Sequence, residues 1–199
     1  MTNKNMGMTD KEEGNFMSRG KLIFITGGAR SGKSNFAEKM AVGLGKSVAY
    51  LATAQPLDEE MVFRIKKHRE KRLSIWETYE EPIEISELVS RLGLEKEVIL
   101  IDCLTLLTSN LLLRKEDKVE DPKWQEEILA EIEKLVEVSY KVPAQVIIVS
   151  NEVGMGLVPD NSLGRVYRDI LGRVNSIIAD KADDVFMMVS GIPLKIKGC

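Results

Sequence analysis

The chain alternates between short apolar runs and longer segments with helical periodicity. Apolar runs bounded by turn-forming residues predict β-strands over residues 21–26, 47–52, 97–102, 144–150 and 184–190. The segments between and beside them predict α-helices over residues 33–44, 57–72, 83–92, 104–114, 122–140 and 163–182. Strands that alternate with helices favour a mostly parallel sheet covered on both faces, so the sequence predicts an α/β fold.

The organisation along the chain is simple. Residues 1–20 are polar and lack the apolar core of a signal peptide, so we interpret them as a mobile N-terminal tail. Residues 21–199 suit a single domain. The charged stretch at 114–123 predicts a surface loop before a helix.

Composition narrows the class of protein. With 44% hydrophobic and 30% charged residues, the chain has the balance of a soluble globular protein. Its longest apolar runs are strand-length, so no membrane span is expected. The two cysteines, Cys103 and Cys199, are too few for a disulfide framework. This low number fits a protein of the reducing cytoplasm. A net charge of −3 argues against a nucleic-acid partner.

The segment "FITGGARSGKSNFAEKM" at 24–40 carries the clearest motif. Gly27, Gly32, Lys33 and Ser34 fit the pattern G-x-x-x-x-G-K-[ST], between a predicted strand and a predicted helix. Such a loop points backbone N–H groups and a helix N-terminus at polyphosphate, while Lys33 adds charge and Ser34 offers its hydroxyl to Mg²⁺. The motif therefore predicts nucleotide binding, but it does not separate a kinase from an ATPase motor or a GTP switch.

Two acidic residues are candidates for the metal side of the site. Asp102 ends the apolar strand "VILID", the Walker B arrangement, from which a carboxylate can reach Mg²⁺. Glu152 follows "VIIVSN" and would also lie at the carboxyl edge of the sheet, where open α/β proteins bind ligands. We favour Asp102, although either could be a solvated or capping carboxylate.

A basic run, "RIKKHREKR" at 64–72, holds the only histidine, His68. On a helix, Arg64, His68 and Arg72 share one face. Alone, such a run is more often a solvated face than a site. Nearby positive charge would nevertheless keep His68 neutral and able to act as a nucleophile, while the arginines could hold phosphate oxygens. This combination suits transfer of a phosphorus-centred group through a covalent histidine intermediate.

The loop at 150–162 is long and contains Gly154, Gly156 and Pro159. Loops of this length at strand ends are usually functional, the alternative being a flexible connector. The helix that follows contains Arg165, Arg168 and Arg173. The sequence leaves open whether these arginines bind an anion or only line the exposed side of the helix.

From 21 to 197, the sequence resembles the bifunctional adenosylcobinamide kinase and adenosylcobinamide-phosphate guanylyltransferase family of cobalamin biosynthesis. The matching segments are "ITGGARSGKS", "YLATAQPLDEEM", "RIKKHREKR" with "WETYEEP", "LIDCLTLLTSNLL", "SNEVGMGLVPDN" and "GRVYRDILGRVN". The arginine-containing phosphate loop, the R-I-x-x-H-x-x-x-R helix and the N-E-V-G-M-G loop are far more specific together than any one alone. The family often has a tryptophan where this chain reads "LTLLTSN", and the first twenty residues lie outside the usual pattern.

The resemblance implies a P-loop NTPase domain of RecA-like type, commonly assembled as a homotrimer. It implies that ATP or GTP phosphorylates the aminopropanol hydroxyl of adenosylcobinamide. GTP then guanylylates a histidine and releases pyrophosphate, and the GMP passes to adenosylcobinamide phosphate. A plain small-molecule kinase with His68 at the surface, and a GTP-binding regulator with the long loop as its switch, are the alternatives.

The resemblance also implies the site residues. His68 would carry GMP, Lys33 would act in catalysis, and Ser34 and Asp102 would hold Mg²⁺. The phosphate loop would comprise Gly27, Gly28, Ala29, Arg30, Ser31, Gly32, Lys33 and Ser34. The remainder of the GTP site would comprise Thr53, Ala54, Gln55, Arg69, Glu70, Lys71, Arg72, Glu80 and Asp102.

Overall fold

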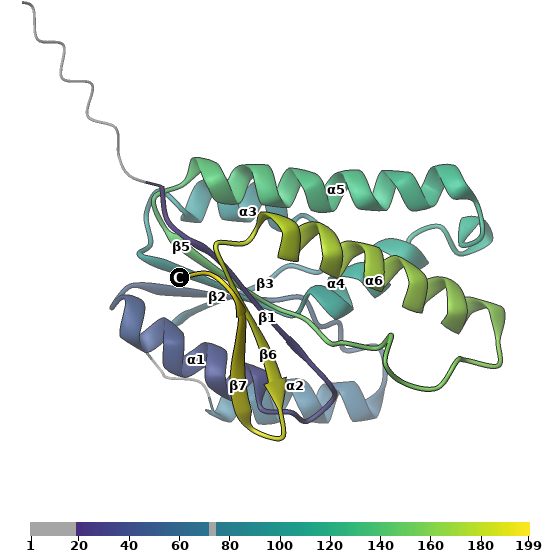
Figure 1. Ribbon diagram of the computed structural model, residues 1–199, viewed down its shortest axis with the longest axis horizontal. Helices are drawn as coiled ribbons and strands as arrows, with labels where there is room; N and C mark the ends of the chain where they lie inside the picture. Colours follow the sequence, from purple (N-terminus) through teal and green to yellow (C-terminus); the bar gives the residue numbers. More distant parts are fainter. Residues whose placement is uncertain (1–18, 72–74) are drawn as a thin grey trace, which may run out of the picture.

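The structure, a computed structural model, describes residues 19–71 and 75–199, apart from the side chains of Arg64, His68 and Lys71. A seven-stranded sheet with the order β3-β2-β4-β5-β1-β6-β7 forms its centre (Figure 1). The strands are β1 (Leu22–Gly27), β2 (Val48–Ala52), β3 (Glu77–Glu80), β4 (Val98–Asp102), β5 (Gln145–Val149), β6 (Asp184–Val189) and β7 (Ile192–Lys197). All neighbouring pairs are parallel except β6 with β7, so the predicted α/β fold with a mostly parallel sheet is confirmed.

Helices cover both faces of the sheet. α1 and α2 lie on one side, and α3 to α6 lie on the other (Figure 1). The helices are α1 (Lys33–Leu44), α2 (Glu59–Lys71), α3 (Ile85–Leu92), α4 (Leu104–Leu113), α5 (Pro122–Lys141) and α6 (Ser162–Lys181), with a 3₁₀ turn at Glu116–Lys118 within the expected loop at 114–123. The described residues contain no helix that is both long and apolar enough to cross a membrane.

Each face of the sheet has its own core, because successive side chains of a strand point to opposite faces. On the α1 side, Ala37 and Ala41 pack with alternate residues of the central strands. On the other side, apolar stripes of α5 and α6, among them Ile128, Leu135 and Val174, pack with the remaining strand residues. Burial on both faces explains why the central strands appear in the sequence as continuous apolar runs.

The two edge strands, β3 and β7, are absent from the sequence prediction. β3 has the polar sequence "ETYE" and is mostly exposed. β7, "IPLKIK", is exposed along its whole length and contains Pro193 and two lysines. Neither therefore shows the apolar run of a buried strand, and a proline is tolerated at an edge.

Most of the expected tail at 1–20 lies outside the described residues, but its last two residues contact the domain. Arg19 forms an ion pair with Asp183, 2.7 Å between Nη2 and Oδ1, and its guanidinium lies 4.4 Å from the centre of the Tyr140 ring. The N–H of Gly20 donates to the carbonyl of Val142 at 3.1 Å. Residues 19 and 20 are thus attached at the amino end of the sheet.

The strand order places the functional segments. β1 leads into the phosphate loop, β4 ends at Asp102, and β5 lies between them. This order, with one strand inserted between the other two, agrees with the expected RecA-like type of P-loop domain. Because these strands are parallel, their carboxyl ends meet at one edge of the sheet, where such folds bind ligands.

Candidate active site

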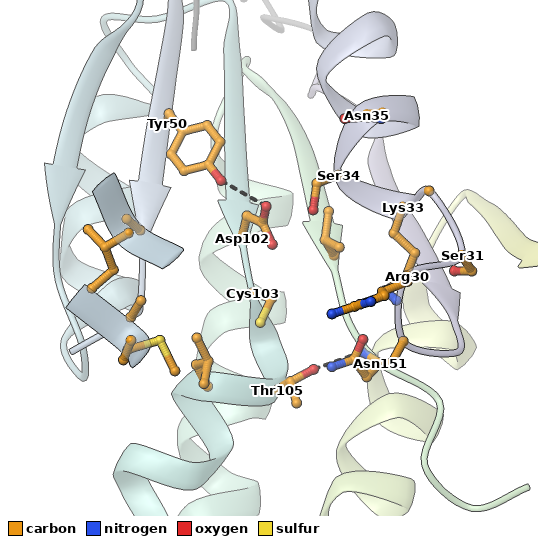
Figure 2. A pocket seen from close by; sticks show the side chains of 18 of the residues that line it. Arg30, Ser31, Lys33, Ser34, Asn35, Tyr50, Asp102, Cys103, Thr105 and Asn151 are labelled. Atoms are coloured by element: carbon orange, nitrogen blue, oxygen red, sulfur yellow. Dashed lines mark hydrogen bonds between the residues drawn. The ribbon is translucent and has the colours of Figure 1, made fainter. Parts of the chain in front are cut away.

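A cavity of about 560 Å³ opens at this carboxyl edge (Figure 2). The phosphate loop and the start of α1 form one wall, and α2 with the end of β3 forms another. The ends of β2, β4 and β5 form its floor. Of the predicted site residues, the cavity is lined by Ala29, Arg30, Ser31, Gly32, Lys33, Ser34, Ala54, Glu80 and Asp102.

The glycines of the phosphate loop are required by its backbone. Gly27 has φ 148° and Gly32 has φ 94°, conformations that L side chains rarely adopt. A Cβ on Gly27 would lie 2.5 Å from the carbonyl oxygen of Met188. The turn between β6 and β7 also supports the loop, because the N–H of Gly191 donates to the carbonyl of Ser31 at 3.0 Å.

Lys33, the first residue of α1, points back into this loop. Its ammonium donates to the carbonyl oxygens of Gly27 at 3.0 Å and Gly28 at 2.7 Å. The residue is only 7% exposed. Burial lowers the pKa of its ammonium, an effect that Cys103 and Asp102 partly oppose. A positive charge held beside backbone N–H groups at a helix N-terminus makes an anion site.

Asp102 lies across the cavity from Ser34 (Figure 2). Oδ2 of Asp102 accepts a 2.8 Å hydrogen bond from the hydroxyl of Tyr50, whose ring stacks on Trp76 with 6.5 Å between the ring centres. A hydroxyl and a carboxylate are hard oxygen ligands of the kind that Mg²⁺ prefers. Among the described residues, no three His, Cys, Asp or Glu side chains cluster as a metal site.

Glu152, the competing acid, has a different role in the structure. Its Oε1 accepts a 2.6 Å hydrogen bond from the N–H of Gly154, within its own loop. Its own N–H donates to the carbonyl of Gly27 at 2.9 Å. The side chain is not among those that line the cavity, so the geometry favours Asp102 as the acid facing the phosphate loop.

Thr53 joins the ends of two strands rather than lining the cavity. Its fully buried hydroxyl donates to the carbonyl of Cys103 at 2.7 Å and accepts from the N–H of Cys103 at 2.9 Å. Asn110 of α4 donates to the carbonyl of Thr53 at 2.8 Å. Ala54 then lines the cavity, and Gln55, half-buried, does not.

α2 forms the wall opposite the phosphate loop, and Met61 and Ile65 face the cavity. The backbone of His68 belongs to α2 and follows Met61 by seven positions and Ile65 by three. Arg69 forms an ion pair with Glu80, which ties α2 to the end of β3.

Parts of the predicted basic face lie outside the described residues. These parts are Arg72 and the side chains of Arg64, His68 and Lys71. Glu70 is exposed. The expected face of Arg64, His68 and Arg72 therefore stays a prediction.

The three arginines near the long loop contact protein groups. Arg165 donates to the carbonyl of Asp160 at 2.8 Å and to that of Pro159 at 3.1 Å, which fixes the end of the loop. Arg173 pairs with a glutamate of α5 at 2.7 Å, and Arg168 pairs with its neighbouring aspartate at 3.5 Å. These contacts account for the arginines without an anion.

Several cavity residues were not predicted from the sequence. Tyr50 occurs within an apolar strand and has the signature of a core residue. Thr105 and Asn151 have no motif of their own, although Asn151 follows β5 so closely that the rule for strand ends would have identified it. Cys103 also lines the cavity, but burial, reinforced by Asp102, raises the pKa of its thiol to about 11. A thiol with that pKa is protonated near neutral pH and is a poor nucleophile.

A phosphate loop facing a strand-end carboxylate on a mostly parallel sheet defines a P-loop nucleotide-binding protein. Residues 23–196 match the family described as cobinamide kinase / cobinamide phosphate guanyltransferase. The chain belongs to this family. The resemblance inferred from the sequence motifs is thereby confirmed.

The chain is also similar to curated relatives over most of its length. It is 42% identical over 181 residues to the bifunctional adenosylcobalamin biosynthesis protein CobU of Escherichia coli (strain K12), covering 88% of this chain and 99% of the relative. It is 41% identical over 174 residues to the corresponding CobP of Pseudomonas aeruginosa, covering 87% and 96%. A solved structure from Pyrococcus horikoshii OT3 is 7% identical to this chain and has a TM-score of 0.53. The match covers 90% of this chain and 87% of the solved chain, and it shows similarity of fold alone.

Proposed function

We propose that the protein phosphorylates adenosylcobinamide with ATP or GTP, and then transfers GMP from GTP, through His68, to adenosylcobinamide phosphate to give adenosylcobinamide-GDP. Membership of the cobinamide kinase and guanyltransferase family supports both activities. The curated relatives, named as bifunctional adenosylcobalamin biosynthesis proteins, support them as well.

One observation carries the proposal for this chain. The phosphate loop and α2, the helix of His68, line the same cavity from opposite sides. A triphosphate held at Lys33 therefore lies between the loop and the histidine helix. Kinase chemistry needs only the loop, whereas guanylyl transfer needs a nucleophile near the α-phosphate, and α2 supplies the one histidine of the chain.

In the kinase step, the hydroxyl oxygen of adenosylcobinamide attacks the γ-phosphorus in line, and the bond from that phosphorus to the bridging oxygen breaks. The nucleoside diphosphate leaves with the electron pair, and the hydroxyl proton is released. Lys33 and the N–H groups of the phosphate loop stabilise the negative charge that shifts toward the leaving group. This step needs positioning and charge neutralisation rather than a protein nucleophile.

In the guanylyl step, a ring nitrogen of His68 attacks the α-phosphorus of GTP. A P–N bond forms, the bond to the β-phosphate oxygen breaks, and pyrophosphate leaves. A phosphate oxygen of adenosylcobinamide phosphate then attacks the same phosphorus, the P–N bond breaks, and the imidazole is restored. Two easier displacements thus replace one direct transfer.

Ser34 and Asp102 would hold Mg²⁺ in this scheme. Bound there, the ion would neutralise charge on the phosphate oxygens. The hydrogen bond from Tyr50 occupies one oxygen of Asp102 and leaves the other available to the ion. In the same cavity, the guanidinium of Arg30 and the hydroxyl of Ser31 would also bind polyphosphate oxygens.

We also propose a homotrimer in the cytoplasm. The resemblance to the family supports the trimer. The two cysteines, Cys103 and Cys199, are both free, which fits a reducing compartment. Light scattering on the purified full chain checks the oligomeric state, and a mass of one or two chains contradicts the trimer.

Labelled GTP tests the central proposal. The protein is incubated with GTP carrying the label in the α-phosphate or in the γ-phosphate, and is then denatured and washed. Retained α-label is expected, together with its release on addition of adenosylcobinamide phosphate. A plain kinase or a GTP switch retains neither label, and that result would overturn the guanylyl step.

A further inference from the structure

Asn151 is a polar residue of the cavity that the scheme above leaves without a role. It comes two residues after the end of β5, the strand that lies between β1 and β4. It therefore occupies the middle of the site, between the phosphate loop and Asp102. Figure 2 shows Asn151 on the same side of the cavity as Arg30 and Lys33.

The backbone of Asn151 is fixed on both sides. Its N–H donates to Oγ1 of Thr105 at 2.7 Å, and its carbonyl accepts from Nδ2 of Asn175 at 2.9 Å. Asn175 is itself oriented by Ser150, whose hydroxyl donates to Oδ1 of Asn175 at 2.7 Å. With both backbone groups used, the side-chain amide is the group left to face a ligand.

The residues that hold Asn151 are buried and polar. Ser150 is fully buried, Thr105 is 7% exposed and Asn175 is 8% exposed. Satisfied polar networks in a low-dielectric interior are rigid and specify a single arrangement. Thr105 of α4, Ser150 directly after β5 and Asn175 of α6 therefore hold the backbone of Asn151 in one position.

The chemistry of the amide fits a phosphate oxygen. A carboxamide donates two hydrogen bonds through its NH₂ group and carries no charge. In a cavity that Lys33 and Arg30 also line, the amide adds donors without adding repulsion between cations, and it does not titrate. Within the described part of the chain, the amide of Asn151 makes no hydrogen bond that would compete for this role.

We propose that the side-chain amide of Asn151 donates a hydrogen bond to the γ-phosphate of the bound nucleoside triphosphate, and that Asn175 is a positioning residue for it. The γ-phosphate is the group concerned because the lysine of a phosphate loop reaches the β- and γ-phosphates, and Asn151 lines the same side of the cavity as Lys33 (Figure 2). The inference rests on the proposed function. It makes the site distinguish a triphosphate from a diphosphate.

Nucleotide binding tests this without any corrinoid. We would compare the wild type with Asn151→Ala and Asn151→Asp for a non-hydrolysable GTP analogue and for GDP, by equilibrium titration. A hydrogen bond to a charged group is worth roughly a 10- to 100-fold change in binding. We expect a loss in this range for the GTP analogue with Asn151→Ala, a larger loss with Asn151→Asp, and less than about a threefold change for GDP in the alanine variant.

Asn161 offers a matched control. Its side chain caps α6 by accepting from the N–H of Gly164 at 2.7 Å, and an aspartate caps a helix equally well. Asn161→Asp makes the same chemical change in the same loop, and should leave both affinities unchanged. Asn175→Ala should reproduce part of the loss for the GTP analogue while sparing GDP, which a general loss of structure would not do.

The binding results test the role of Asn151, and α-label trapping tests the proposed function. Equal losses for the GTP analogue and GDP, or no loss for either, overturn the role of Asn151, whether or not wild-type protein traps the α-label. A wild type that traps no α-label overturns the guanylyl step. Only the measured affinities for the GTP analogue and GDP test whether Asn151 makes the site prefer a triphosphate.

Discussion

The hydroxyl of Tyr50 donates a 2.8 Å hydrogen bond to Oδ2 of Asp102, across the pair of strands β2 and β4. The phenol ring is buried and stacks on Trp76, so the donor is held in one place. Asp102 consequently presents a defined orientation to the cavity. Residues that orient a metal-binding carboxylate typically influence metal affinity or activity about 10- to 100-fold.

Tyr50→Phe should therefore weaken the response to Mg²⁺. The variant keeps the buried ring and loses only the hydroxyl. We expect the Mg²⁺ concentration for half-maximal kinase activity to rise about tenfold, with little change in the maximal rate. An unchanged Mg²⁺ titration together with a reduced maximal rate would mean that Tyr50 does not act through the metal.

Asp102→Asn should weaken Mg²⁺ dependence more than Glu152→Gln does. Asp102 faces Ser34 across the cavity, whereas Oε1 of Glu152 accepts from the N–H of Gly154, a hydrogen bond that a glutamine can still accept. Parallel Mg²⁺ titrations of the two variants measure the difference. The reverse order would assign the metal-side acid to Glu152.

Lys33→Ala should impair both half-reactions, because each needs a triphosphate in the same loop. Loss of one preorganised electrostatic contact slows a reaction by roughly 10²- to 10³-fold. Kinase rate and α-label trapping are measured separately. Lys39→Ala removes an exposed lysine from the same helix and serves as the control. Near-normal rates for Lys33→Ala in both steps would refute the assignment of the phosphate loop.

His68→Ala should abolish α-label trapping and guanylyl transfer, because the chain has no other histidine. Phosphorylation of adenosylcobinamide should persist, since direct transfer of the γ-phosphoryl group needs no protein nucleophile. The wild-type adduct should be labile to mild acid and stable to base, as a phosphoramidate is. An adduct that forms normally in His68→Ala would place the nucleophile elsewhere, for example at Lys66 or Lys67.

Asp183→Asn should reduce stability at neutral pH but not in acid. The hydrogen bond from Arg19, together with that from the N–H of Leu22, holds the pKa of the Asp183 carboxyl below its usual value. A lowered native-state pKa contributes stability above the unfolded pKa of about 3.9, and that contribution disappears as the pH falls through the native-state pKa.

We expect Asp183→Asn to lower the free energy of unfolding by about 1 kcal/mol at pH 7, since the ion pair is partly exposed. The difference from wild type should shrink below about pH 4. Urea unfolding at several pH values measures this. Asp180→Asn, which removes an exposed partner of Lys181, is the control. A difference that stays constant down to the acid range would show that the carboxylate charge is not responsible.

The sequence predicts the centre of the fold better than its edges. β4 is recognisable because burial on both faces requires an apolar run, and its last residue, Asp102, interrupts that run at the point where the strand reaches the cavity. β7 is not recognisable in this way, because it pairs on one side only and faces solvent. Its position depends on pairing with β6, which local pattern does not encode.

The sequence likewise predicts some residues of the candidate site and not others. The phosphate loop is predictable because its backbone conformation restricts the residue types at Gly27 and Gly32. The hydrogen bond from Tyr50 to Asp102 and the network around Asn151 join residues that are far apart in the sequence. Apart from Asn151, which directly follows the end region of β5, each of those residues has an ordinary local context, so only the folded arrangement identifies them.

The contact between Gly191 and the phosphate loop has a consequence for synthesis on the ribosome. The loop is synthesised before the turn between β6 and β7, which carries the N–H group that supports the carbonyl of Ser31. A growing chain that has folded its first strands and helices still lacks this support. This hydrogen bond to the phosphate loop can therefore form only after the hairpin of β6 and β7 has left the exit tunnel, which couples readiness for GTP to completion of the sheet.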